Sequence, residues 1–312
     1  MKKTAPYGSW PSDITTSLMT AGTVGLSEAR LFGGTLYWLE SRPQEQGRTA
    51  ILRLDSEGEK QEVIPSSYSC RSRVHEYGGA CYLPTSTGLY FVNFEDQQLY
   101  CVGDKGVEKL TDQPAMRFAD LAYNSHHNVL VAVCEEHNGQ SAEPANRLVA
   151  IDPESGVVST LHEGQDFYAS ASFSNDGKKI CWLSWAHPAM PWDGTSLWCA
   201  DFTDGELHSA TVVAGGVDES VVQPEWSPSD DLFFVSDRSN WWNIYKLKRD
   251  AVGTNALKVC AMEAEFGSPQ WQFGMTRYGF IANNTILASY SHGGLEKLAT
   301  IDTDTGLSLI HI

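Results

Sequence analysis

Short apolar runs, each bounded by Gly, Pro, Asn or Asp, recur along the whole chain, and helical periodicity is almost absent. The runs LYWLE, LYFVN, LVAVC, ICWLS, LFFVS and ILASY begin at residues 36, 89, 130, 180, 232 and 286. They recur about every 50 residues. Apolar runs of this length between turn-forming residues are typical of β-strands.

A second apolar run follows each of these, as in AILRLD, RLVAID and KLATID, and most are followed by a Gly- and Asp-rich turn such as SEGE, PESG or TDTG. Such turns favour a tight hairpin into a further strand. Extended stretches, for example residues 169–177 and 222–230, precede several of the first runs. One unit therefore has four antiparallel strands, which we call A to D from the inside outward, and its regular return predicts a β-propeller.

The predicted chain is thus all-β, with an N-terminal arm over residues 1–22 and a propeller of four-stranded blades over residues 23–312. Six blades are visible in the sequence. Their predicted boundaries are 23–65, 70–113, 115–164, 166–215, 219–263 and 265–312.

Charge and cysteine usage narrow the class of protein. A net charge of −17 argues against nucleic acid or an anionic membrane as a partner, because phosphate binding needs clustered Lys and Arg. No signal peptide follows the N-terminal lysines, and no apolar stretch is long enough to span a membrane. The seven cysteines are scattered and never spaced as CxxC, which predicts free thiols in a reducing compartment, here the cytoplasm.

Three stretches carry a resemblance to a known family: SRVHEYGG, SFSNDGKKICWLSWAHPAMPWDGTSLW and QPEWSPSDDLFFVSDRSNWWNIY. They resemble the N-terminal propeller of prolyl oligopeptidase-family serine peptidases, and within that family the dipeptidyl aminopeptidases and acylaminoacyl peptidases. The similarity runs from APYGSWPS to about residue 302. The pattern WxxHPxMPWDGTxLW is the specific one, since WSPSDDLFFVSD recurs in many propellers.

The resemblance implies an α/β-hydrolase domain after the propeller, carrying Ser, Asp and His, but the chain has no GxSxG nucleophile elbow. The SHGGLE segment (291–296) matches an HGG oxyanion loop only superficially, and we predict a hairpin there. The family propeller usually has seven blades, so a seventh is expected to be missing from this chain. The implied partners are the C-terminal hydrolase domain and small peptide substrates, and no cofactor is expected.

Propeller geometry places the start of each strand A and each B-to-C connection on the same face. Chemically unusual residues gather in these places, where a rigid scaffold presents its binding loops. The predicted substrate or domain-interface rim comprises Arg73, His75, Glu76, Glu135, Glu136, His137, His187, Met190, Trp192, Asp193, Arg238 and Trp241.

Two interpretations of RSRVHEYGG (71–79) remain open. The stretch contacts substrate or the hydrolase domain, or else Arg73 and Glu76 pair with neighbouring blades while Tyr77 packs between sheets. In both, Gly78 and Gly79 permit close approach of the innermost strands.

Glu135 and Glu136 also have two interpretations. A carboxylate pair binds the free amine of a substrate strongly in a partly desolvated cavity, as the resemblance implies for dipeptidyl peptidases. Alternatively the pair is a solvated or structurally paired turn. His187 has no His or Cys partner at metal spacing, so no metal site is predicted.

Three functions fit these observations. The first is the non-catalytic propeller of a serine peptidase, which gates access and helps to bind small peptides. The second is a stand-alone propeller that binds a protein partner. The third, a propeller enzyme with chemistry on its own rim, would need a metal cluster or a carboxylate pair across the channel.

Overall fold

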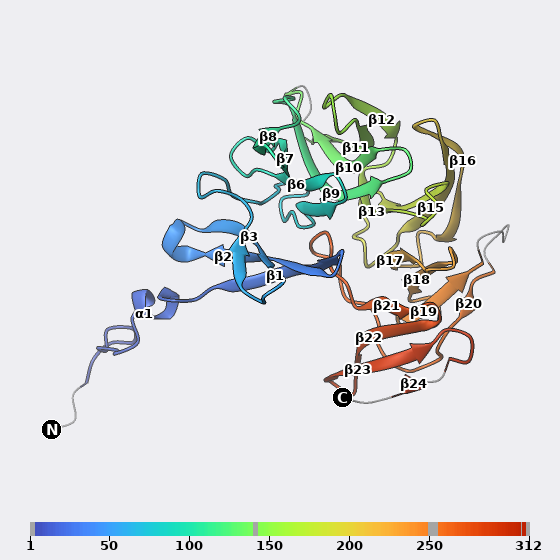
Figure 1. Ribbon diagram of the computed structural model, residues 1–312. Helices are drawn as coiled ribbons and strands as arrows, with labels where there is room; N and C mark the ends of the chain where they lie inside the picture. Colours follow the sequence, from blue (N-terminus) through green and yellow to red (C-terminus); the bar gives the residue numbers. More distant parts are fainter. Residues whose placement is uncertain (1–3, 140–142, 249–254, 307, 310–312) are drawn as a thin grey trace. The chain divides into compact units, whose positions relative to one another are not determined.

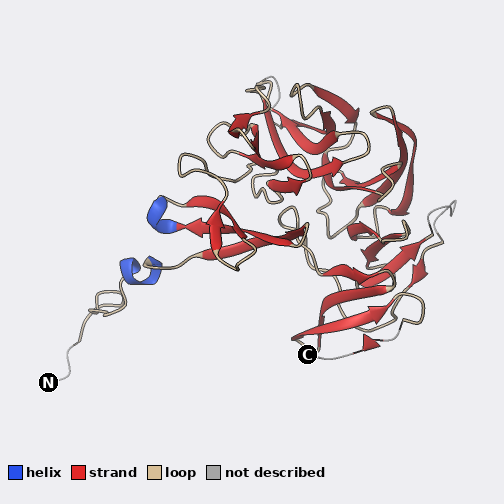
Figure 2. Cartoon of the chain, viewed as in Figure 1, coloured by secondary structure: helices blue, strands red, loops and turns tan. Residues whose placement is uncertain are grey.

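The computed structural model describes residues 4–139, 143–248, 255–306 and 308–309. The chain divides into two compact units, Met1–Cys70 and Arg71–Ile312. Strands make up nearly all of the regular structure (Figure 2). The described helices are α1 (Thr16–Thr20) and the 3-10 turn η1 (Pro43–Glu45), neither with the length or apolar character needed to cross a membrane.

The first unit contains the predicted arm and one blade. The arm carries α1, a helix that the sequence did not predict, and the Thr15 hydroxyl caps it by accepting a hydrogen bond from the Leu18 amide at 3.1 Å. The blade is a four-stranded antiparallel sheet in the order of the chain. Its strands are β1 (Gly25–Phe32), β2 (Thr35–Arg42), β3 (Arg48–Leu54) and β4 (Lys60–Glu62).

The second unit contains five further four-stranded antiparallel sheets (Figure 1). The second blade has β5 (Tyr82–Thr85), β6 (Gly88–Val92), β7 (Leu99–Gly103) and β8 (Gly106–Lys109). The third has β9 (Met116–Asn124), β10 (Val129–Glu136), β11 (Ala145–Ile151) and β12 (Val158–His162). The fourth has β13 (Phe167–Phe173), β14 (Lys179–Trp185), β15 (Ser196–Thr203) and β16 (Glu206–Gly215).

The fifth blade has β17 (Val221–Trp226), β18 (Leu232–Ser236), β19 (Asn243–Leu247) and β20 (Leu257–Lys258). The sixth has β21 (Tyr278–Ala282), β22 (Thr285–His292), β23 (Leu295–Asp302) and β24 (Ser308–Leu309). Six antiparallel four-stranded blades are therefore present in the described part of the chain, and the predicted all-β propeller is confirmed.

The cores of the second unit lie between neighbouring blades. Alternate residues on each strand face opposite sides, so both faces of an inner sheet can be buried. One cluster joins the second, third and fourth blades around Trp182 and Phe202. Another joins the fourth and fifth around Leu197 and Phe234, and a third joins the fifth and sixth around Phe233 and Tyr290. This face-to-face packing is why the strand runs read as continuous apolar segments.

The innermost strands are bulged, a feature that the apolar pattern did not reveal. Ladder register shifts occur near Asp120, Ser170 and Gln223, and each of these residues has a positive φ, of 54°, 56° and 47°. The bulges connect neighbouring blades: the Asp120 amide donates to the Ala80 carbonyl, and the Ser170 amide donates to the Asp120 carboxylate. A bulge re-aims side chains and increases local twist, which suits strands gathered around an axis.

Gly78 and Gly79 join the two ends of the second unit. The Phe273 amide donates to the Gly78 carbonyl at 2.9 Å, and Gly79 forms a parallel bridge with Phe273. A Cβ at Gly78 would lie 2.2 Å from the Ser72 carbonyl oxygen, and one at Gly79 would lie 2.4 Å from that of Phe273. The predicted close approach of backbone at these glycines is confirmed. The backbone that approaches them is that of Phe273, in the segment before the first strand of the sixth blade.

Candidate functional site

A cavity of about 700 Å³ opens among the second to sixth blades, within the second unit. Its walls come from the starts of the innermost strands and from the B-to-C connections, as the face argument predicted. We call it the aromatic cavity. The segments that line it are 75–78, 143–147, 163–167, 185–192 and 270–273, with one further residue each from β10 and β14 and two each from β13 and β17.

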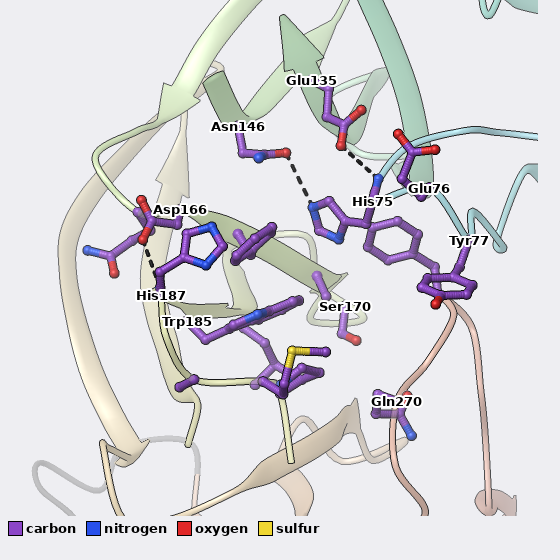
Figure 3. Close-up of a pocket in the computed structure, with 18 of the residues that line it drawn as sticks. His75, Glu76, Tyr77, Glu135, Asn146, Asp166, Ser170, Trp185, His187 and Gln270 are labelled. Carbon is purple, nitrogen blue, oxygen red and sulfur yellow. Dashed lines mark hydrogen bonds between the residues drawn. The ribbon is translucent and has the colours of Figure 1, made fainter. Parts of the chain in front are cut away.

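His75 occupies the centre of the polar wall (Figure 3). Its Nε2 donates to Asn146 Oδ1 at 3.2 Å, and its backbone amide donates to the buried Glu135 carboxylate at 2.7 Å. The imidazole contacts the rings of Phe167 and Phe273, with centroids 5.1 and 4.8 Å away. Burial among these rings lowers the pKa of His75 to about 4, so the ring is neutral at neutral pH.

Aromatic side chains form the remaining walls. Phe167 and Trp185 stack with centroids 5.3 Å apart, and His187 meets the edge of Phe167 at 4.9 Å. Across the cavity, Trp271 contacts Trp192 at 4.5 Å and Tyr77 at 5.8 Å. Each of these rings therefore packs against another ring of the same cavity.

The cavity is also acidic. Five carboxylates line it, and Arg147 is the single Lys or Arg among its lining residues in the described structure. Arg147 is neutralised by Glu136 and by Glu163, whose carboxylate lies 3.1 Å from its Nε. The other lining carboxylates are those of Glu76, Glu135, Glu143 and Asp166.

Glu76 is exposed at the cavity wall (Figure 3), and its carboxylate has no hydrogen-bond or ion-pair partner among the described residues. Such a surface favours a cationic group next to an apolar one.

The structure brings half of the predicted rim residues together. Those that line the aromatic cavity are His75, Glu76, Glu135, His187, Met190 and Trp192. The segments 75–76 and 187–192 therefore share one cavity, although the role of the rim in binding stays a prediction.

The other predicted rim residues lie elsewhere. Arg73 stacks over the Phe94 ring at 4.3 Å, within its own blade. His137 donates through Nε2 to Glu135 at 3.1 Å, and Asp193 accepts from the Met190 amide at 2.8 Å, which fixes the turn. Arg238 pairs with Glu219 at 2.7 Å.

Arg238 and Trp241 line a second depression, of about 610 Å³, that we call the polar groove. Trp241 is 37% exposed, whereas its neighbour Trp242 is half-buried and packs on the core of the fifth and sixth blades. The two consecutive tryptophans therefore differ in burial, as adjacent residues near a strand do when their side chains face opposite sides. The polar groove also contains Asp218, Asp237, Asn240, Glu265, Arg277 and Glu296.

The structure excludes one of the two interpretations left open for each of these stretches. Tyr77 does not pack between sheets: it is 57% exposed and stacks on Trp271. Glu135 and Glu136 do not converge, because consecutive residues of β10 point to opposite faces. Glu135 is buried toward His75, while Glu136 turns away to Arg147. The two cannot hold one ammonium together in this arrangement.

Sequence reasoning also missed several lining residues. Trp271 and Gln270 lie in the segment before β21, whose pattern is the least regular of the six units. Asn146 and Asp166 lie at strand ends and carry no motif. The one usable signal was the PQWQF stretch itself, in which an exposed tryptophan stands between two glutamines.

Within the residues that the structure describes, no group of three His, Cys, Asp or Glu side chains is placed to hold a metal ion. The SHGGLE segment forms the predicted hairpin, with Gly293 and Gly294 between β22 and β23.

Comparisons with known proteins identify the fold. No protein-family model matches the chain, and no curated protein does so significantly. A puromycin-hydrolysing peptidase of Mycobacterium tuberculosis is 32% identical over 99% of this chain, with a TM-score of 0.85. A puromycin hydrolase is 29% identical over 99% of this chain, with a TM-score of 0.87.

The match covers 50% of each of those two proteins, so this chain spans half the length of these relatives. A prolyl endopeptidase shares the fold alone, at 13% identity and a TM-score of 0.67 over 93% of this chain. The predicted resemblance is confirmed: the chain is a β-propeller domain of the prolyl oligopeptidase family of peptidases.

Proposed function

We propose that this chain is the non-catalytic propeller of a serine peptidase and that its aromatic cavity helps to bind small peptide substrates for an α/β-hydrolase domain. The observation that carries the proposal is the composition of the cavity: aromatic walls and five carboxylates against one paired guanidinium. A peptide with an apolar first side chain and a free amine complements both features. The rings bury the side chain, and the carboxylates attract the ammonium.

The same observation separates two substrate classes. An aminopeptidase substrate carries a free ammonium, whereas an acylaminoacyl substrate carries a neutral amide at that end. The uncompensated carboxylate of Glu76 favours the first class, because an acylated end gains nothing from it and displaces its water. We therefore favour a dipeptidyl aminopeptidase-like activity for the full-length protein over an acylaminoacyl peptidase-like one.

A gating role follows from the walls of the cavity. They are built from connections between strands, so only peptides small enough to enter a cavity of about 700 Å³ reach the hydrolase side. We also propose a cytoplasmic location, supported by seven cysteines that are all free in this chain. By itself the chain is expected to hydrolyse no peptide, since the sequence contains no nucleophile elbow.

The test uses two probes, Phe-Gly-Gly with a free amine and its N-acetylated form, titrated against the purified chain in a calorimeter. The free amine is expected to bind about tenfold more tightly, and added salt should reduce the difference. Equal affinities would refute recognition of the amine. If neither probe binds, the cavity is not a peptide site. In a separate assay, turnover of a chromogenic dipeptide by the chain alone would refute its non-catalytic role.

A further inference from the structure

Two cysteines of the fourth blade face each other across its central strands. Cys181 on β14 is the register partner of Cys199 on β15, and both are free. The Phe202 amide donates to the Lys178 carbonyl at 2.8 Å, just outside the paired residues Lys179 and Asp201. Residues 178 and 202 are thus a hydrogen-bonded pair. Hydrogen-bonded and non-hydrogen-bonded pairs alternate along an antiparallel ladder, so Lys179 with Asp201 is a non-hydrogen-bonded pair and Cys181 with Cys199, two residues further on, is another.

Non-hydrogen-bonded pairs bring side chains closest together. Their Cα atoms lie about 4.5 Å apart, which falls within the range of roughly 4.4–6.8 Å that a disulfide spans. Neighbouring pairs show that side chains meet directly across these strands. Lys179 Nζ lies 2.8 Å from Asp201 Oδ1 on the same face, and on the other face Trp182 and Trp198 stack within 2° of parallel.

The two thiols differ in access. Cys181 is fully buried in the core between the fourth and fifth blades, whereas Cys199 is half-buried at its margin. A reagent from solution therefore meets Cys199 first. Burial raises the pKa of both thiols, which slows the reaction at neutral pH and makes it faster in alkali.

We propose that Cys181 and Cys199 form a reversible thiol–disulfide site whose oxidant is a low-molecular-weight disulfide. Cys199 Sγ, after losing its proton, attacks the reagent's S–S bond and forms a mixed disulfide, and one reagent thiolate leaves and takes up a proton. Cys181 Sγ then attacks Cys199 Sγ, and the second reagent thiol leaves. One reagent disulfide is reduced to two thiols, and two protein thiols are oxidised to one disulfide.

The position of the pair connects it to the aromatic cavity. Leu183 and Trp185 follow Cys181 on β14 and line the cavity, and the connection between β14 and β15 carries His187, Met190 and Trp192. A disulfide between positions 181 and 199 would close the base of this hairpin. In a reducing compartment the pair stays open, and an oxidising shift closes it.

The reduced, folded chain is incubated with oxidised glutathione at about pH 8.5, where more thiolate is present. It is then alkylated and cleaved with cyanogen bromide. Met190 is the one methionine between the two cysteines, so cleavage separates them unless a disulfide joins the fragments. The expected result is joined fragments that separate on reduction, with two of the seven thiols lost.

Matched variants make the result specific. Cys199→Ser should abolish the joined fragments. Cys101→Ser should leave them unchanged, because Cys101 is also half-buried on a third strand but faces Tyr90. Cys181→Ala should leave a lasting glutathione adduct on Cys199. An unresolved adduct in the wild-type chain, linkage to another cysteine, linkage only in denaturant, or no reaction would each overturn the proposal.

Discussion

Two segments of similar composition have opposite roles in this propeller. VHEYGG (74–79) and SHGGLE (291–296) each contain a histidine, a glutamate and a glycine pair. In the first, an added Cβ at either glycine would collide with backbone oxygen, and the main chain there joins the second blade to the segment before the sixth. In the second, such a Cβ would have no described atom within 4 Å apart from those of the glycine and its two chain neighbours. The first pair is required by packing and the second only by its turn.

The chemistry of the two segments diverges in the same way. His75 is enclosed by aromatic rings at the cavity, whereas His292 is exposed and its Nδ1 donates to the Glu263 carbonyl at 3.0 Å. Glu76 lines the cavity and has no partner within the part of the chain that the structure describes, whereas Glu296 pairs with Arg277 at 2.7 Å. Composition alone therefore identifies neither segment as a site, because the environment sets the properties of each group.

The largest expected difference between the segments concerns their glycines. Gly79→Ala places a Cβ against the Phe273 backbone at a positive φ of 102°, and should destabilise the chain by about 3 kcal/mol or more. Gly294→Ala, at a φ of 78° in open space, should cost about 1 kcal/mol. Urea unfolding of both variants measures this, and equal losses would show that the close approach contributes nothing.

The second difference appears on acidification. The folded pKa of His75 is about 4, below its unfolded value, so the unfolded chain binds the extra proton first. The stability that neutral His75 permits is fully present above about pH 6.5 and is lost as pH falls toward about 4. From about pH 7 to about pH 5 this loss should reach roughly 1–2 kcal/mol.

Unfolding free energies of His75→Gln and His292→Gln at these two pH values provide the check. The His75 variant should lose less stability on acidification than the wild-type chain. The His292 variant should keep the wild-type pH dependence of stability, because that substitution leaves His75 in its buried setting. A wild-type pH dependence in both variants would contradict the burial argument.

The third difference concerns ligand binding and depends on the proposed function. Glu76→Gln removes an unpartnered cavity carboxylate and should weaken binding of free-amine Phe-Gly-Gly about fivefold, or roughly 1 kcal/mol. Glu296→Gln breaks an exposed ion pair outside the aromatic cavity and should leave that affinity unchanged. If calorimetry gives both variants the same affinity, Glu76 has no role in recognising the amine.

The smallest difference concerns two exposed side chains beside the glycine pairs. Tyr77→Ala loses an aromatic contact with Trp271 and should destabilise the chain by about 0.5–1 kcal/mol. Leu295→Ala, at a side chain that is 66% exposed, should stay within about 0.5 kcal/mol. Thermal unfolding in parallel distinguishes them, and a larger effect at Leu295 would mean that this hairpin is covered in solution.

The sequence by itself determined the strands and their grouping. Runs such as ICWLS and LFFVS are apolar throughout because both faces of those sheets are buried, and Gly- and Asp-rich turns mark where each hairpin closes. It also determined that the second-blade start and the 186–195 connection share a face, because strand direction alternates within every blade. These are local regularities, repeated six times, and they need no knowledge of long-range contacts.

Only the tertiary structure decided which residues meet. The alternation along β10 separates Glu135 from Glu136, and Trp271 reaches Tyr77 and Trp192 from a segment far away in the chain. It likewise decided that Gly79 meets Phe273 and that Cys181 faces Cys199. The physical reason is that contacts across blades depend on register, bulges and the angle between sheets, and the pattern of apolar residues in one strand records none of these.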